Sequence, residues 1–161
     1  MINKMKQKPY ILLSSCLLDL HTQWDEDCKR YEELIDLVKE GKAVFFCPEQ
    51  GGGLPTPRIP SEIEKGKTSV DVLNNKGKVV NKNGNDVTKE YLKGAYMALQ
   101  ICKQFNLTVA ILKEKSPSCG SSKTYDGSFE GNKKEGTGLT AELLRQNGIK
   151  VYSEDNFPRD I

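Results

Sequence analysis

Short apolar runs alternate with longer segments of helical spacing along this chain. Runs of four to six apolar residues are typical of strands buried on both faces of a parallel sheet. Such runs lie at residues 10–15, 43–46, 108–112 and 149–152. Apolar residues recur at helical spacing in residues 27–41, in a segment that ends near 106, and in residues 139–147. The pattern predicts the α/β class, with an open, mainly parallel, Rossmann-like sheet and flanking helices.

The segments between these elements follow other patterns. Residues 68–73 and 78–81 alternate in strand fashion on either side of a polar, glycine-containing turn, which predicts a small β-hairpin excursion. Residues 48–62 contain four prolines and three consecutive glycines, so we expect a shaped loop there and neither helix nor strand. The glycine-rich, polar stretch 121–138 is expected to be irregular. Without a repeat or a long linker, we expect a single domain over residues 1–161.

Charge and composition narrow the class of protein. A formal net charge of +2 with scattered lysines predicts neither a nucleic acid nor a membrane surface as partner. No segment reaches the roughly 18 apolar residues that a membrane span requires. Residues 1–18 have a basic start but only a short apolar run before Asp19, so they are interpreted as a lead-in to the first strand and not as a signal peptide. These features predict a cytoplasmic protein, in which cysteines more often bind metals or catalyse than form disulfides.

Three of the five cysteines, Cys16, Cys47 and Cys119, each follow one of the expected buried strands. The carboxyl ends of parallel strands share one edge of a sheet, so the three thiols are expected to converge there. Converging thiolates commonly hold a soft metal centre with one coordination position open. The alternative for each is a small core residue, since free cysteine is often buried. Cys102 lies in phase with the apolar face of its helix, and Cys28 is expected at a solvated helix start.

Polar side chains accompany these cysteines in their loops. Glu49 can act as a general base on water, and a solvated or N-capping role is the alternative. Ser116 and Ser118 flank a proline, where a hydroxyl either donates to a substrate or a cluster sulfur, or stabilises the turn. Arg58 follows a stiff, proline-containing segment and is suited to a bidentate contact with substrate or with a core carboxylate. His21 is available as a fourth ligand, although a surface position is the simpler interpretation.

Five segments carry a resemblance to a known family. They are SSCLLD (14–19), CPEQGGGLPTPR (47–58), GNDVTKEYLKGA (84–95), ILKEKSPSCGSSKTYDGSF (111–129) and GLTAELLRQNGIKVYSE (138–154). In this order and over nearly the whole chain, they resemble the 2-thiouracil desulfidase family. The resemblance implies a [4Fe-4S] cluster held by Cys16, Cys47 and Cys119, with one iron free to take the sulfur of a thiolated base. It further implies that Glu49 is the catalytic carboxylate and Ser116 the catalytic serine.

The implied reaction removes sulfur from a small thiolated nucleobase and gives the oxo base and hydrosulfide without a redox change. Two other functions use the same cysteines: a zinc-dependent hydrolase, and a non-catalytic sensor or binding protein that carries a cluster. The chain departs from the family pattern after its first cysteine, with Asp19 and Glu26 in place of glycines and Gln23 in place of arginine, while Asp25 is kept. These departures predict an altered substrate pocket. Nothing in the sequence specifies the oligomeric state.

Overall fold

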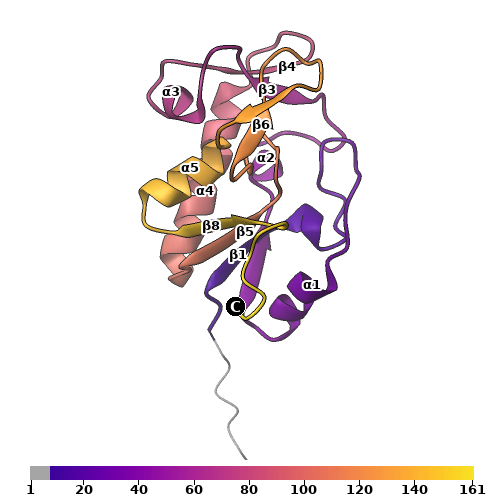
Figure 1. The fold of residues 1–161 in the computed structure, drawn as a ribbon, viewed down its shortest axis with the longest axis vertical. Coiled ribbons are helices and arrows are strands. Elements are labelled where there is room, and N and C mark those ends of the chain that lie inside the picture. The colour runs from indigo at the N-terminus through magenta and orange to yellow at the C-terminus, as the bar shows by residue number, and fades with distance from the viewer. Residues whose placement is uncertain (1–7) are drawn as a thin grey trace, which may run out of the picture.

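The computed structural model describes residues 8–161, whose centre is a four-stranded sheet (Figure 1). All neighbouring strands in this sheet are parallel, in the order β2-β1-β5-β8. The strands are β1 (Ile11–Ser14), β2 (Ala43–Phe46), β5 (Val109–Leu112) and β8 (Lys150–Ser153). This topology confirms the predicted α/β class with an open parallel sheet, and the four apolar runs predicted as strands are its four strands. The basic lead-in expected before β1 lies outside the described residues.

Helices cover both faces of the sheet because successive side chains of each strand point to opposite sides. On β1, Leu12 packs in one apolar cluster, with α4 (Thr88–Phe105) and α5 (Leu139–Gln146). Ile11 and Leu13 pack in a second cluster on the other face, with α1 (Glu32–Lys39). Figure 1 shows α4 and α5 side by side on one face and α1 on the opposite face. The central strand is therefore buried on both sides, as its continuous apolar run predicts.

Two small antiparallel sheets lie beyond the main one. In the first, β3 (Ser61–Ile63) pairs with β4 (Val79–Asn81). The predicted hairpin is therefore present, but its first arm is wrong, because residues 69–73 form the short helix α3 (Ser69–Leu73). The side chains of Thr68 and Asp71 cap this helix reciprocally, and this signal outweighs the strand-like alternation.

Two further expectations are corrected. The stretch 121–138 was expected to be irregular, and it contains the second small sheet, formed by β6 (Lys123–Tyr125) and β7 (Lys133–Glu135). The loop expected over residues 48–62 opens with a one-turn helix, α2 (Pro48–Gly51), and its last two residues already belong to β3. Proline is well tolerated in the first turn of a helix, where its missing N–H would have no helical partner.

The helix α2 packs against α4 at a distance that only glycine permits. A Cβ atom on Gly94 would lie 1.8 Å from the carbonyl oxygen of Pro48, and one on Gly52 would lie 2.0 Å from that of Glu90. The two backbones are thus in direct contact. This contact fixes the orientation of α2 and of the residues that it presents to the carboxyl edge of the sheet.

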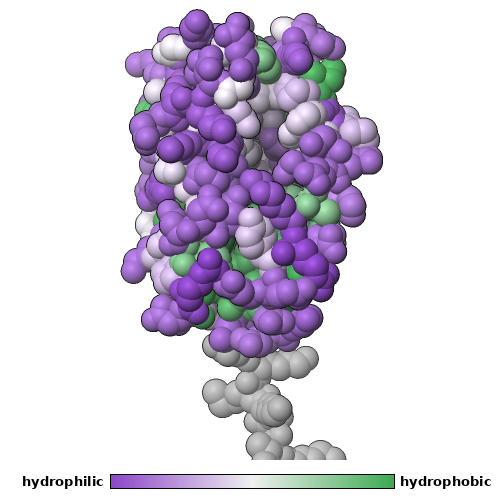
Figure 2. Space-filling view, turned by 45° about the vertical axis from the view of Figure 1, so that its right-hand side comes forward, coloured by the Kyte–Doolittle hydropathy of each residue, from purple (hydrophilic) through white to green (hydrophobic). Residues whose placement is uncertain are grey.

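The face of the molecule seen in Figure 2 is mostly hydrophilic, with hydrophobic residues in small groups. Among residues 8–161, no helix is both long and apolar enough to cross a membrane.

Gly94→Ala is expected to destabilise the protein, although alanine normally stabilises a helix interior relative to glycine. The added methyl group must push α2 away from α4, so we expect a loss of about 1–3 kcal/mol in the free energy of unfolding. Urea denaturation measures this change. Lys93→Ala, at the exposed neighbouring position, is the control and should have little effect. A Gly94→Ala protein as stable as the wild type would show that the two helices do not make this contact.

Candidate metal and active site

The carboxyl ends of three parallel strands bring Cys16, Cys47 and Cys119 to one cavity. Cys16 lies in a single 3-10 turn directly after β1, and Cys47 is the residue before α2, at the end of β2. Cys119 lies in the loop that follows β5. All three line the same cavity, whose volume is about 360 Å³. The sequence placed these cysteines at one edge of the sheet, and the structure brings them together there.

Burial, together with neighbouring charge, opposes ionisation of the three thiols. Burial, and after it the charge of Cys47, raise the pKa of Cys16 to about 12. Burial also raises the pKa of Cys47. At Cys119 burial raises the pKa most, and the charges of Cys47 and Cys16 raise it further. A hydrogen bond with Ser14 lowers this pKa but does not offset the rise. Three thiolates at these positions thus need a cationic partner.

A soft metal centre fits this donor set. Metal-bound thiols lose their protons, and a cationic centre shared by all three sulfurs removes the repulsion among them. The five cysteines of the chain, all within the described residues, are free of disulfides, so each of the three sulfurs is available as a ligand. Cys102 is buried on α4, where packing accounts for it, and Cys28 lies in the loop before α1, away from this cavity.

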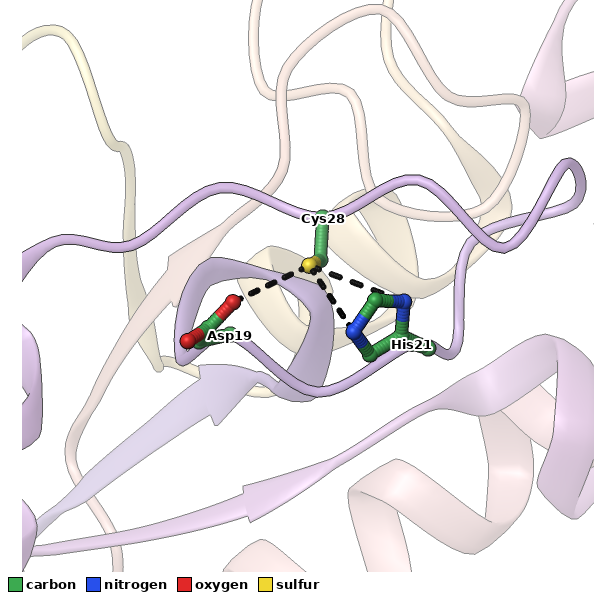
Figure 3. Close-up of side chains that lie close together, drawn as sticks. All are labelled: Asp19, His21 and Cys28. Atoms are coloured by element: carbon green, nitrogen blue, oxygen red, sulfur yellow. Dashed lines mark hydrogen bonds between the residues drawn. The ribbon is translucent and has the colours of Figure 1, made fainter.

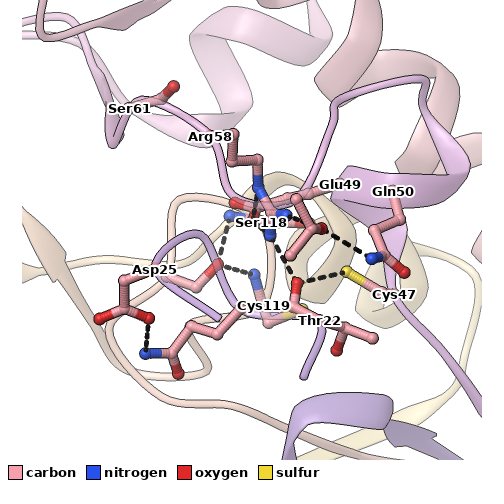
Figure 4. A network of polar contacts seen from close by, with 12 residues as sticks. Thr22, Asp25, Cys47, Glu49, Gln50, Arg58, Ser61, Ser118 and Cys119 are labelled. Atoms are coloured by element: carbon pink, nitrogen blue, oxygen red, sulfur yellow. Dashed lines mark hydrogen bonds and ion pairs between the residues drawn. The ribbon is translucent and has the colours of Figure 1, made fainter. Parts of the chain in front are cut away.

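Glu49 projects from α2 into the same cavity and is held at both of its oxygens (Figure 4). The Tyr91 hydroxyl donates to Oε1 at 2.6 Å, and Nε of Arg58 donates to Oε2 at 3.0 Å. Nη2 of Arg58 also contacts Oε2, which makes the ion pair two-pronged. The side chains of Glu49 and Arg58 are 12% and 4% exposed, so this pair is almost entirely shielded from water.

Arg58 also ties together the loops around Glu49. Its Nη2 donates to the carbonyl oxygen of Thr22 at 2.9 Å, and its Nη1 donates to the Thr56 hydroxyl at 2.9 Å. The Cys47 thiol donates to the same Thr22 carbonyl at 3.7 Å. Of the two contacts expected for Arg58, the geometry favours the core carboxylate. Its guanidinium positions Glu49 and has few donors left for a substrate.

The two serines of the SPSC loop have different surroundings. Ser116 lines the cavity, and its Oγ accepts the backbone N–H groups of Ser118 and Cys119 at 3.0 and 3.1 Å. Its own O–H remains free to donate. Ser118 is 1% exposed and pairs with the Thr140 hydroxyl at 3.0 Å. Its side chain is not part of the cavity lining, so the geometry favours the turn-stabilising alternative for this residue.

The residues that depart from the family pattern differ in whether they line the cavity. Gln23 is part of its lining, whereas Asp19 and Glu26 are not. Asp19 has a φ of 63°, in the left-handed region that glycine enters without steric cost. His21 is exposed and lies outside the cavity, and Asp25 accepts a hydrogen bond from the Gln23 amide at 3.1 Å. Only one of the three departures therefore changes the cavity wall directly.

Sequence reasoning missed two polar neighbours of the candidate site. Tyr91 lies in the predicted helix that ends near residue 106, and the apolar periodicity of that helix carries no signal for a hydroxyl that reaches Glu49. Lys113 lines the cavity and donates to Glu154 at 2.9 Å. Burial would lower the pKa of Lys113, but the Glu154 carboxylate outweighs burial and raises it. The sequence did carry a signal for this pair, because Lys113 directly follows β5 and Glu154 directly follows β8.

A buried carboxylate, Glu114, shapes the loop that carries Ser116 and Cys119. It accepts the backbone N–H groups of Ser121 at 2.9 Å and of Lys123 at 3.1 Å, and the Ser121 hydroxyl at 2.6 Å. Burial alone would raise its pKa, but these donors lower it to about 2. The carboxylate thus holds the end of the loop against the start of β6.

Comparisons with known proteins agree with this geometry. Residues 11–156 match the sequence profile of the 2-thiouracil desulfurase family, and the chain belongs to that family. YbbK, an uncharacterized protein of Bacillus subtilis (strain 168), is 47% identical over 147 residues, which cover 91% of this chain and 97% of YbbK. A solved structure of TudS, a [4Fe-4S]-dependent thiouracil desulfidase, is 44% identical, covers 94% of both chains and superposes with a TM-score of 0.83.

Glu114→Gln is expected to make the free energy of unfolding less sensitive to acid. The folded-state pKa of about 2 lies below the unfolded value, so ionised Glu114 stabilises the fold above about pH 4.5. That contribution is lost as the pH falls toward 2. Thermal unfolding of both proteins at several pH values measures it, with exposed Glu135→Gln as the control. Parallel stability curves for Glu114→Gln and the wild type would contradict this role.

Proposed function

We propose that this chain is a [4Fe-4S]-dependent desulfidase that removes sulfur from a thiolated nucleobase of the thiouracil type. The observation that carries the proposal is the convergence of three cysteine thiols and one buried carboxylate on a single cavity. Membership of the 2-thiouracil desulfurase family and the similarity to TudS support it. These comparisons do not favour a zinc hydrolase or a non-catalytic sensor. A reducing compartment keeps the thiols available, so we place the enzyme in the cytoplasm.

Cys16, Cys47 and Cys119 are the residues that would hold the cluster. Three protein ligands leave one iron open, and when bound the cluster supplies a Lewis acid for the soft sulfur of a thiocarbonyl group. Lys113 lies at the same cavity, and its charge opposes the rise in the pKa of Cys16. A fixed ammonium group there also stabilises negative charge that develops on the substrate.

Glu49 is the proposed general base. Arg58 and Tyr91 hold its carboxylate in one orientation, facing the cavity that Cys47 also lines. In this position it can take a proton from a water molecule as the water attacks the thiocarbonyl carbon. Oxygen from water replaces sulfur at that carbon, and sulfur leaves as hydrosulfide. The exchange changes no oxidation state, so the reaction is a hydrolysis.

The cavity suits a small planar substrate. Its volume of about 360 Å³ lies near the lower end of the range of roughly 300–1,000 Å³ for small-molecule sites. Trp24, Tyr125 and Phe129 give its walls aromatic surface on which a base can stack. The free O–H of Ser116 can donate to a ring nitrogen or oxygen. We therefore propose a free thiolated base as the substrate, and no nucleic acid as partner.

Cys16→Ser, Cys47→Ser and Cys119→Ser are each expected to abolish cluster binding, since a hydroxyl replaces an iron ligand. Anaerobic reconstitution followed by iron and sulfide counting measures the loss. Cys28→Ser and Cys102→Ser are the matched controls and should retain full iron. The ligand assignment is wrong if any of the first three variants keeps the wild-type iron content.

Glu49→Gln is expected to keep its iron and to lower kcat for hydrosulfide release from 2-thiouracil by about 10²–10⁴-fold, because an amide cannot accept the proton from water. The amide also faces Arg58, so iron content and melting temperature are measured on the same samples. Exposed Glu135→Gln should behave as the wild type. An iron-loaded, folded Glu49→Gln enzyme with normal kcat would eliminate Glu49 as the base. The absence of turnover by the loaded wild type with both 2-thiouracil and 4-thiouracil would refute the proposed activity itself.

A further inference from the structure

A second group of metal-ligating side chains lies outside the cavity. Asp19, His21 and Cys28 come from the loop between the turn at Cys16 and the helix α1. One ligand atom from each lies within 4.8 Å of the other two. Figure 3 shows the Cys28 sulfur between the Asp19 carboxylate and the His21 ring.

The spacing of these atoms fits one tetrahedral metal ion. The Cys28 Sγ lies 3.2 Å from Oδ1 of Asp19 and 3.7 Å from Nε2 of His21. Zinc binds sulfur, nitrogen and carboxylate oxygen at about 2.0–2.3 Å, so tetrahedral angles place its ligand atoms about 3.5 Å apart. One oxygen of Asp19 and one nitrogen of His21 lie within 4.8 Å of each other, so an ion seated among the three atoms would draw this pair closer.

Two of the three ligands, His21 and Asp19, are also oriented by an outer partner. Nδ1 of His21 lies 2.7 Å from the carbonyl oxygen of Glu26. A carbonyl only accepts, so Nδ1 carries a proton, and in the neutral ring the lone pair is then on Nε2, the nitrogen nearer to Cys28. Arg30 donates to Oδ2 of Asp19 at 3.3 Å, which leaves Oδ1 toward the sulfur. Metal-binding histidines and carboxylates characteristically have such partners.

The backbone holds the two arms of this loop together. Leu18 and Arg30 form an antiparallel bridge. On one side of it the Asp19 N–H donates to the Lys29 carbonyl at 3.1 Å, and the Lys29 N–H donates to the Cys16 carbonyl at 3.1 Å. This short ladder places Asp19 opposite Lys29, the residue next to Cys28, without any contribution from the side chains themselves.

A cysteine nucleophile is the other function for such a trio, and the contacts oppose it. The Cys28 thiol donates its proton to Asp19, and this hydrogen bond raises the pKa of the thiol. A nucleophilic cysteine requires the opposite shift. A cation, in contrast, takes the place of that proton and binds the sulfur and the carboxylate together.

We propose that Asp19, His21 and Cys28 form a second metal site, which binds one Zn²⁺ with water as the fourth ligand. The mixture of sulfur, nitrogen and oxygen donors suits zinc, and the exposed position leaves room for the water. The ion would restrict the motion of this loop, which also contributes Thr22, Gln23 and Trp24 to the cavity wall. The site is independent of the proposed desulfidase activity.

Zinc uptake by the cluster-loaded protein under anaerobic conditions tests this site. After brief treatment with a chelator and confirmation that iron is retained, Zn²⁺ is titrated by calorimetry, and zinc and iron are counted in the same samples. We expect about one zinc per chain with iron unchanged. His21→Ala and Cys28→Ser should each weaken zinc binding at least tenfold, the lower bound for loss of even an outer-shell partner.

A pair of charge-matched variants separates ligation from simple attraction of a cation. Asp19→Asn should weaken zinc binding, and asparagine tolerates the positive φ at this position. Asp36→Asn removes one exposed carboxylate from α1 and should leave the affinity within twofold of the wild type. Zinc should also slow amide hydrogen exchange over residues 20–28 in the wild type and not in Cys28→Ser.

Three outcomes would overturn the proposal. The first is no zinc uptake by the wild type. The second is uptake that displaces an equivalent part of the iron, which would place zinc at the three cavity thiols. The third is an unchanged affinity in both His21→Ala and Cys28→Ser.

Discussion

The shielded ion pair between Glu49 and Arg58 is the interaction on which the cavity depends. It joins α2 to the loop that follows it, and through the Thr22 carbonyl it reaches the loop after β1. Tyr91 connects the same carboxylate to α4. Removing one partner of a buried pair typically costs about 3–5 kcal/mol, because the other charge is left uncompensated. The proposed base and the placement of α2 and of the loop after β1 therefore rest on one set of hydrogen bonds.

Two other buried carboxylates build the walls by accepting backbone N–H groups. Glu114 gathers residues 121–123 beside the loop that carries Cys119. Glu62, on β3, accepts the N–H groups of Gly127 and Phe129 at 2.8 and 3.2 Å and so holds the connection between β6 and β7 over the cavity. Loops with few apolar side chains cannot be fixed by packing alone. Here charge-assisted hydrogen bonds give them a defined position.

The sequence predicted the main sheet well because a strand buried on both faces must be apolar, as residues 11–13 of β1 are. The edge strand β2 is apolar too, but the expectation that it is buried on both faces was wrong, because its Phe45 is 48% exposed. The convergence of Cys16, Cys47 and Cys119 followed from the parallel topology alone. The partner of Arg58 was predicted only as one of two alternatives, since contacts between distant loops leave no periodic signal. The helix α3 was missed because the capping pair Thr68 and Asp71 outweighs an alternation that is weak over five residues.

The backbone contact between α2 and α4 has a mechanical consequence. Cys47 and Glu49 are two residues apart at the start of one short helix, and that helix is seated directly on α4. A proposed metal ligand and the proposed base consequently form a single rigid unit, whose internal spacing is set by covalent geometry. Any motion of the cavity that admits a substrate or releases a product must therefore come from walls other than α2. The reacting groups stay in register while those walls move.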